Sequence, residues 1–202
     1  MEVKLITYTP EIVISDMAKN CYANNTNKDL TRSLVHSHKH LAVLRFAFAV
    51  IQVDGISIAC QNQVVRSKHL DFLVESKRYV SADKGGFTFI FPKGEKEMID
   101  LYDKQWNSAL ETYNKLISLG AKKEDARAVL PMNTSTKMGI AGNIQSWIDA
   151  IRLRVDTKAQ LEIRTMYINI WGLLKEVYPN VFIEEMIING RTYAEWKKEL
   201  QC

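Results

Sequence analysis

The sequence predicts a mixed α/β domain that contains more helix than strand. Three observations lead to this class. Apolar residues recur at spacings of three and four over long segments, short β-branched and aromatic runs separate these segments, and only nine Gly and four Pro interrupt the 202 residues. Because no Ser/Gly/Pro-rich linker or repeat divides the chain, we expect one domain over residues 1–202, with a central sheet flanked by helices.

Strands and helices are expected to alternate in the first half of the chain, where β-branched runs and helical spacings follow one another. The expected elements are a strand at Val3–Tyr8, a helix at Ile12–Tyr22, a helix from an N-cap at Asp29 to about Leu44, a strand at Phe46–Val53 that ends in a turn at Asp54-Gly55, and a short helix capped by Ser57 that carries Ala59, Cys60, Gln63 and Val64.

The sequence of the second half of the chain predicts mainly helices. The longest spans about Glu95–Leu119, where seven apolar residues form a stripe that Gly120 stops. The other expected elements are a strand at Phe87–Phe91, a short helix at Lys123–Val129 before Pro131, a helix at Asn143–Arg152, and a helix at Thr157–Val177 that opens with a capping-box pattern from Thr157 to Gln160.

Composition excludes several classes of protein. The chain is 47% hydrophobic, with four Trp, eight Tyr and seven Phe, which is too apolar for a disordered protein. Its longest apolar stretch, Leu41–Val53, contains Arg45 and Gln52 and is shorter than the ~20 residues of a membrane span. The first ten residues lack the pattern of a secretory signal, so we expect a cytoplasmic protein.

Three scattered cysteines predict neither a disulfide framework nor a zinc site, and they suit a reducing compartment. His36 and His40 have the i, i+4 spacing of a metal-binding pair, but no acidic residue accompanies them, so no metal site is expected. The net charge of +4 is spread along the chain and permits an anionic partner, for which a small phosphorylated ligand serves as well as nucleic acid.

No phosphate loop, dinucleotide fingerprint or nucleophile elbow is present. The remaining candidates are arginines close to hydroxyl and amide side chains. Guanidinium groups bind phosphate oxygens in pairs, and a nearby Ser hydroxyl or Gln amide completes a site for a phosphorylated small molecule. The arginines with such neighbours are Arg66, Arg78, Arg127 and Arg154.

Five stretches resemble, in order, the motifs of the flavin-dependent thymidylate synthases. They read VKLITYTP with AKNCY (3–22), KHLAVLRF (39–46), GISIA and QVVR leading into RSKHLDFLVESKRY (55–79), EDARAVLP (124–131), and a block that contains LR and AQLEI (143–163). The third stretch is similar to the family pattern R-H-R-x-x-S-x-N-E-x-S-x-R-Y, and the fourth to E-x-A-R-x-x-L-P. The resemblance extends from about residue 3 to about residue 187, and it implies the fold of that family.

The resemblance implies a site for deoxyuridylate (dUMP). The residues implied to bind its phosphate and sugar are Gln63, Ser76, Arg78 and Arg127, and Arg154 is implied to bind the pyrimidine ring. Arg154 and Ser76 are the residues implied to act in catalysis. One-carbon transfer to C5 of uracil needs electron density at C5, which a nucleophile at C6 or fixed charges around the ring can provide. The family uses fixed charges, and Arg154 is expected to supply this polarisation.

The resemblance also implies methylenetetrahydrofolate as the carbon donor, with FAD and NADPH as the source of hydride. The residues that match or keep charge at flavin-binding positions are Arg66, Lys68, Asn143, Leu153 and Lys158. Other flavin positions differ: the family's Glu-His is Arg45-Phe46, its Asn-Glu is Leu73-Val74, and an Arg is Gln145. The chain therefore resembles a divergent member of the family with an eroded flavin-binding signature. We expect it to bind the nucleotide, whereas flavin binding is in doubt.

The resemblance implies conversion of dUMP to dTMP by a homotetramer that binds a nucleotide and a folate, with neither nucleic acid nor a membrane as partner. Two alternatives stay open. One is a flavin-independent hydroxymethylase, in which water captures the transferred methylene and Cys60 is a candidate nucleophile. The other is a non-catalytic paralogue that only binds a nucleotide.

Overall fold

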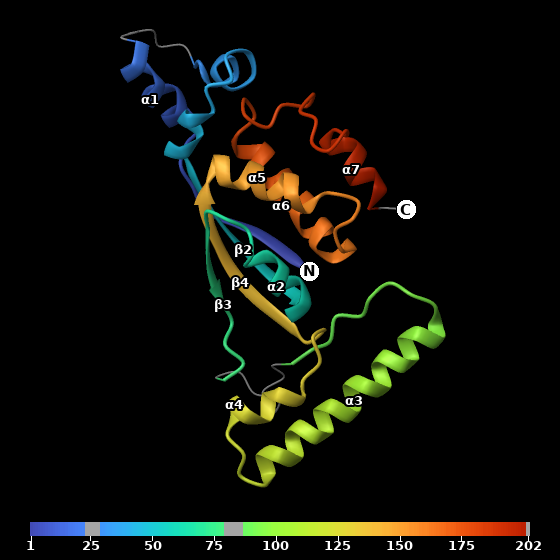
Figure 1. The fold of residues 1–202 in the computed structure, drawn as a ribbon. Helices are drawn as coiled ribbons and strands as arrows, with labels where there is room; N and C mark the ends of the chain where they lie inside the picture. The colour runs from blue at the N-terminus through green and yellow to red at the C-terminus, as the bar shows by residue number, and fades with distance from the viewer. Residues whose placement is uncertain (23–28, 79–86, 201–202) are drawn as a thin grey trace.

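The computed structural model describes residues 1–22, 29–78 and 87–200. Its centre is an antiparallel four-stranded sheet in the order β1-β2-β4-β3 (Figure 1). The strands are β1 (Glu2–Tyr8), β2 (Phe48–Ser57), β3 (Leu70–Val74) and β4 (Ser135–Asn143). The sequence therefore predicts the fold class correctly: a mixed α/β fold with a central sheet and flanking helices.

The two central strands, β2 and β4, pair from Phe48↔Asn143 to Ser57↔Ser135. Alternate residues of each strand are buried, such as Ile51 of β2 and its partner Ile140 of β4. This alternation places one face of the sheet in the main hydrophobic core, because successive side chains point to opposite faces.

The prediction of a turn that ends the strand at Asp54-Gly55 is wrong. β2 continues to Ser57, and the register shifts between Asp54 and Ile56, which is a β-bulge. Gly55 occupies the extra position with φ of 72°, a conformation that glycine adopts without steric cost. The bulge carries the chain directly from β2 into the helix that follows.

Helices cover one face of the sheet. They are α2 (Ile58–Val64), α5 (Ile144–Arg154), α6 (Leu161–Val177) and α7 (Tyr193–Glu199). Figure 1 shows α5 and α6 side by side over the sheet, with α7 packed outside them. The buried residues of α6 include Tyr167 and Trp171, so this helix forms the centre of the main core.

A second, smaller core lies beyond the end of the sheet. The long helix α3 (Lys96–Ser118) runs alongside α4 (Lys123–Ala126) and the 3₁₀ turn Arg127–Val129 (Figure 1). The buried residues of this second core are Phe87, Trp106, Tyr113 and Ala126. The prediction of a long helix near 95–119 is confirmed, because its apolar stripe faces this second core.

Several expected elements differ from the structure. The helix expected from Asp29 to Leu44 consists of a π-helix, Ser33–Ser37, and a 3₁₀ helix, Leu41–Phe46, because Lys39 between them has a φ of 56°. The strand expected at Phe87–Phe91 is only an isolated bridge from Phe89 to Thr134. β3, β4 and α7 were not expected.

The boundaries of the other helices agree more closely with expectation. α1 spans Ile12–Tyr22 as predicted, and Ser57 caps α2. α6 begins at Leu161 rather than at Thr157, because residues 157–159 form a turn and Gln160 occupies the N-cap position without a side-chain cap. Among the described residues, no helix is long and apolar enough to cross a membrane.

Candidate active site

Ser57 and Glu162 join the start of α2 to the first turn of α6. Ser57 Oγ accepts a hydrogen bond from the backbone N of Cys60 at 3.0 Å, which caps α2. The Glu162 carboxylate accepts from the backbone N of Ser57 at 2.7 Å and from Ser57 Oγ at 2.6 Å. Ser57 is fully buried. Since hydrogen bonds to a charged acceptor are the stronger kind, this clasp fixes the N-terminus of α2 against α6.

Arg154 holds the opposite end of α2. It is the last residue of α5, and its Nη2 donates to the backbone O of Gln63 at 2.5 Å. A cation at this position is favourable because the C-terminal end of a helix carries a partial negative charge. The Nε of Arg154 is buried and has no partner among the described residues.

The side chain of Gln63 also contacts the segment before α6. Its Nε2 donates to Gln160 Oε1 at 2.5 Å and to the backbone O of Ala59 at 3.3 Å. Gln63 and Arg154, two of the residues expected to bind the nucleotide, are therefore brought together by direct contact. Gln160, which the sequence placed only in a capping-box pattern, is part of the same cluster.

The interior beside this cluster contains two weakly acidic groups. Burial raises the pKa of the Cys60 thiol, and the Glu162 carboxylate raises it further, although Arg154 opposes the shift. Burial also raises the pKa of Tyr167 to about 12, against a contact of its hydroxyl with Ser67 Oγ at 3.3 Å. A thiol that is fully buried and protonated is a poor nucleophile, so the structure counts against Cys60 as a C6 nucleophile.

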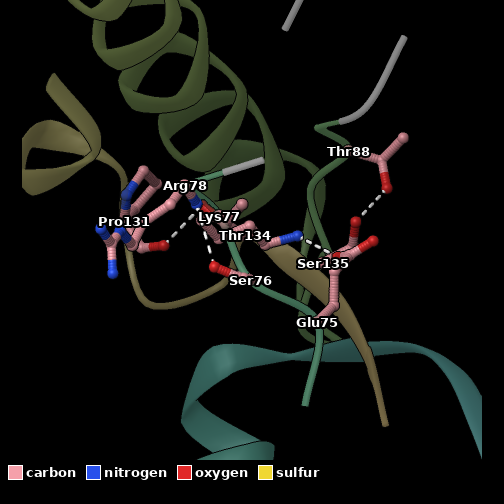
Figure 2. A network of polar contacts seen from close by, with 8 residues as sticks. All are labelled: Glu75, Ser76, Lys77, Arg78, Thr88, Pro131, Thr134 and Ser135. Carbon is pink, nitrogen blue, oxygen red and sulfur yellow. Dashed lines mark hydrogen bonds and ion pairs between the residues drawn. The ribbon is translucent and has the colours of Figure 1, made fainter. Parts of the chain in front are cut away.

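A second cluster lies where the chain leaves β3. Residues 75–78 run beside the segment from Pro131 to Ser135, as Figure 2 shows. The backbone N of Glu75 donates to the O of Lys137 at 2.9 Å, which continues the β3–β4 pairing by one residue. Lys77 is buried, with its Nζ 2.5 Å from Glu75 Oε2 and 5.4 Å from the centre of the Phe87 ring. This pair anchors the segment that carries Ser76.

Ser76 and Arg127 line the same pocket, whose volume is about 320 Å³. Ile58 and Gln61, three residues apart and hence on one face of α2, form another wall. The other lining residues are Glu75, Lys77, Ala128 and Leu130. The structure thus brings Ser76 and Arg127 together although they are far apart in the sequence.

Arg78 lies at the exposed side of this cluster. Its Nη2 is 2.9 Å from Glu124 Oε2. Its backbone N donates to Ser76 Oγ at 3.4 Å (Figure 2). Arg127 Nε donates to the backbone O of Glu124 at 3.2 Å. Glu124 therefore orients both arginines, and the ion pair with Arg78 is a surface contact that an anionic ligand can displace.

The five expected nucleotide residues form two groups in one chain. Ser76, Arg78 and Arg127 form the pocket cluster, while Gln63 and Arg154 lie at the C-terminal end of α2. The pocket is not lined by Gln63 or Arg154. Helix α2 connects the groups, since Ile58 and Gln61 face the pocket while Gln63 contacts Arg154.

The residues expected to bind flavin are mostly at the surface. Arg66, Lys68 and Lys158 are exposed, and Leu153 is 56% exposed. No ion pair involves these three cations among the residues that the structure describes, so their charges suit the phosphates of FAD. Asn143 caps α5 by accepting from the backbone N of Ser146 at 2.9 Å, which leaves its amide NH₂ for a ligand. In charge and donor type, these residues fit the cofactor.

The positions that depart from the flavin pattern carry different chemistry. Phe46 is 56% exposed and Leu73 is 81% exposed, where the family has His and Asn. Gln145 Nε2 donates to Asp149 Oδ1 at 3.0 Å, one turn along α5. An apolar side chain cannot replace the hydrogen bonds of His or Asn, so Phe46 and Leu73 offer the flavin no side-chain hydrogen bond.

The histidines do not form a metal site in the described part of the chain. His36 Nε2 lies 3.0 Å from the backbone O of Val181, and the rings of His38 and His40 meet edge to face with centres 6.2 Å apart. Within residues 1–22, 29–78 and 87–200, no group of three or more His, Cys, Asp or Glu side chains is arranged to hold a metal ion.

Comparison with known proteins decides the family. The model of the family described as thymidylate synthase complementing protein matches residues 4–180. The chain belongs to this family. It is 28% identical over 198 residues to the flavin-dependent thymidylate synthase of Geobacter sulfurreducens, which covers 90% of this chain and 85% of the relative.

Two archaeal relatives carry the same description, flavin-dependent thymidylate synthase. The Pyrococcus furiosus protein is 31% identical over 159 residues, covering 76% of this chain and 63% of the relative. The Haloarcula marismortui protein is 26% identical over 231 residues, covering 90% of this chain and 94% of the relative. The match to the thymidylate synthase complementing protein family confirms the resemblance inferred from five short motifs.

The contacts of Gln160 and Glu162 were not expected from the sequence. Both residues stand in the quoted AQLEI motif, which is the signal that could have singled them out. Their partners, Gln63 and Ser57, are about a hundred positions away in the chain. The ion pair of partly buried Glu75 with buried Lys77 was also not expected, although both residues lie inside the quoted RSKHLDFLVESKRY stretch.

Proposed function

We propose that the chain transfers a one-carbon unit from methylenetetrahydrofolate to C5 of dUMP, giving dTMP. The observation that carries this proposal is the shared pocket of Ser76 and Arg127, built by motif residues in a member of the thymidylate synthase complementing protein family. The names of the relatives, flavin-dependent thymidylate synthase, support the same reaction.

The pocket cluster binds the 5′-phosphate. The Ser76 hydroxyl donates to one phosphate oxygen, and the guanidinium groups of Arg78 and Arg127 neutralise the dianion through paired hydrogen bonds. Binding breaks the exposed contact of Arg78 with Glu124, which costs little because surface ion pairs contribute only ~0–1 kcal/mol. Lys77 stays with Glu75 and keeps the Ser76 segment in place.

Arg154 acts on the pyrimidine ring. Nη2 is held by the Gln63 carbonyl, so the orientation of the guanidinium is set before the substrate binds. The remaining N–H groups polarise the ring carbonyls and raise electron density at C5. C5 attacks the methylene carbon of the folate as one of the two bonds from that carbon to folate nitrogens breaks, and C5 then loses its proton. The second carbon–nitrogen bond breaks with its electron pair going to nitrogen, so tetrahydrofolate leaves and the methylene stays on C5, ready to accept a hydride.

FAD, reduced by NADPH, supplies the hydride that completes the methyl group when the cofactor is bound. In this chain Arg66, Lys68 and Lys158 would hold its phosphates, and Asn143 and Leu153 would contact the rest of the molecule. These assignments are supported by the exposure of the three cations, which form no ion pair with a described residue, and by the amide NH₂ of Asn143, to which no described residue is bonded.

A flavin-independent hydroxymethylase is the second candidate. The observation that favours it is the apolar, exposed character of Phe46 and Leu73 at flavin positions. Without a hydride donor, water would add to the methylene intermediate and give a hydroxymethyl nucleotide. A non-catalytic, nucleotide-binding paralogue is the outcome if no proton leaves C5.

The assembly is proposed to be a homotetramer in the cytoplasm. The sheet face away from α5 and α6 supports an oligomer, because Ile6, Phe48 and Leu73 expose apolar side chains on it. A groove of about 410 Å³ crosses this face. The free thiols of Cys21 and Cys60 suit a reducing compartment. We also propose that residues 1–202 work as a single thymidylate synthase-like domain.

Release of tritium from dUMP labelled at C5 tests the proposed reaction. Wild-type protein with methylenetetrahydrofolate, NADPH and FAD is expected to release tritium into water. An Arg154→Gln variant is expected to release it at least ~100-fold more slowly, as removal of one electrostatic contributor does in other enzymes. An Asn169→Leu variant, changed at an exposed position of α6, is the control. No release by wild type under any cofactor combination would refute the proposal.

A further inference from the structure

The amide of Gln63 is fixed in one orientation by two acceptors. Its Nε2 lies 3.3 Å from the backbone O of Ala59 and 2.5 Å from Gln160 Oε1. A backbone carbonyl only accepts hydrogen bonds, so the atom of Gln63 that faces it must be the NH₂ group. With the NH₂ turned to Ala59, the atom of Gln160 that faces it must be the oxygen. Two contacts thus hold the Gln63 amide in this direction, a long one to the backbone and a short one to Gln160.

Gln63 itself is held in place by its helix. Glu162 clasps the N-cap of α2 through Ser57, and Arg154 Nη2 binds the backbone O of Gln63. The helix is therefore fastened to α6 at one end and to α5 at the other. The remaining freedom of Gln63 is rotation of its side-chain amide, which Gln160 restricts.

The fixed amide leaves Oε1 as the atom of Gln63 that is available to a ligand. No described residue donates to this oxygen. An oxygen with two lone pairs accepts from N–H or O–H groups and repels the oxygens of a phosphate. Of the phosphate and the sugar that the sequence assigns to Gln63 and its partner residues, this oxygen suits the sugar.

We propose that Gln160 is a positioning residue that turns Gln63 Oε1 toward the nucleotide, so that Gln63 selects for a hydrogen-bond donor on the substrate. This inference rests on the proposed function. dUMP offers two such donors, the 3′-hydroxyl of the sugar and N3–H of the uracil ring. 2′,3′-Dideoxyuridylate lacks the first donor, and deoxycytidylate lacks the second, because its N3 is an acceptor.

Gln160→Leu removes the acceptor while it keeps a side chain of similar size, and Gln160→Glu keeps an acceptor oxygen at the same distance. After Gln160→Leu only the longer contact, 3.3 Å to the backbone O of Ala59, holds the Gln63 amide, so the amide can rotate and offer either its NH₂ or its oxygen. The variant is therefore expected to lose discrimination between nucleotides, whereas loss of a merely structural contact would weaken all nucleotides alike. Gln105→Leu, at an exposed position of α3, is the matched control.

Dissociation constants for dUMP, dideoxyuridylate and deoxycytidylate, measured by calorimetry on the four proteins, test the inference. Wild type, Gln160→Glu and Gln105→Leu are expected to prefer dUMP over one analogue by about 5- to 20-fold, the usual effect of leaving one hydrogen-bonding group without its partner. The analogue that is rejected identifies the donor. Gln160→Leu is expected to reduce that ratio to about 2-fold or less.

Unchanged ratios in Gln160→Leu would overturn the inference while the proposed function stands, since wild type would still bind dUMP. A wild-type protein that binds dUMP and both analogues equally would overturn it as well. Failure of wild type to bind dUMP would refute the proposed function and this inference together. Circular dichroism of each variant verifies that the fold is kept.

Discussion

The clasp between Glu162 and Ser57 gives the sharpest prediction for stability. Glu162→Ala removes a carboxylate that accepts from the backbone N and the Oγ of Ser57. Both donors belong to a fully buried residue, so they remain without a partner after the change. Ser57, the N-cap residue of α2, is then no longer hydrogen-bonded to α6.

The magnitude follows from these two contacts. A hydrogen bond to a charged group is worth about 1.5–3 kcal/mol, and the lower value suits a carboxylate that is only half-buried. Two such bonds give a loss of about 3 kcal/mol in the free energy of unfolding. For a chain of this size, that loss lowers Tm by about 6–12 °C. Glu162→Gln keeps one acceptor oxygen and is expected to lose about half as much.

Urea denaturation followed by circular dichroism measures the effect, with Glu176→Ala, an exposed residue of the same helix, as the control. A double-mutant cycle with Ser57→Ala isolates the pair, and a coupling energy of at least about 1 kcal/mol is expected for residues in direct contact. A loss below about 0.5 kcal/mol in Glu162→Ala, or additive effects in the cycle, would refute the role assigned to the clasp.

Three further predictions concern ionisation and binding. Iodoacetamide is expected to label Cys21 in the native protein and to label Cys60 only after unfolding. The reason is that Cys21 is exposed, whereas Cys60 is buried and burial raises the pKa of its thiol. Peptide mapping that finds equal labelling of the two cysteines in the native protein would contradict the burial of Cys60. Burial raises the pKa of Tyr167 to about 12 in the native protein, whereas the pKa of Tyr in the unfolded chain is near 10. Above pH 10 the unfolded chain therefore holds fewer protons than the native protein. The free energy of unfolding is expected to fall by roughly 2–3 kcal/mol between pH 10 and 12. Urea titrations across this range are expected to show a shallower fall for Tyr167→Phe, and an identical slope would remove Tyr167 as the cause. Ser76→Ala is expected to raise KM for dUMP by about 5- to 20-fold through loss of one phosphate hydrogen bond, with a smaller change in kcat; steady-state kinetics that show the reverse would place Ser76 in the chemical step.

The fold could be predicted where local chemistry determines it. β1, α1, α2 and α3 were expected close to their observed bounds, because each has a regular apolar period or a clear cap. β4 was missed although it is central, since Gly139 and Gly142 weaken its pattern. Gly142 faces Leu70 of β3, where a Cβ would lie 2.3 Å from a methyl carbon, so the close approach of these strands explains the glycine.

The broken helix between Asp29 and Leu44 shows a different limit. Lys39 adopts a left-handed conformation that its side chain does not predict, and His40 N binds back to the O of Leu34. Such a break depends on how the flanking π- and 3₁₀ turns pack on the core through residues such as Leu34 and Leu44. Tertiary packing therefore overrides the local helical spacing here.

The candidate site was predictable in its residue types and not in its contacts. Motif resemblance singled out Ser76 and Arg127, and the structure places them in one pocket. It could not reveal that Gln160 binds Gln63 or that Glu162 binds Ser57, because hydrogen bonds between distant segments leave no periodic trace in the sequence. Tyr79, the last residue of one quoted stretch, lies outside the described residues.

The most direct test of the central claim is the identity of the product. Wild-type protein is incubated with dUMP, methylenetetrahydrofolate and NADPH, with and without FAD, and the nucleotides are identified by mass spectrometry. The account predicts dTMP in the presence of FAD. Unchanged dUMP under both conditions, in a protein that binds dUMP, would contradict the claim that this site transfers a one-carbon unit.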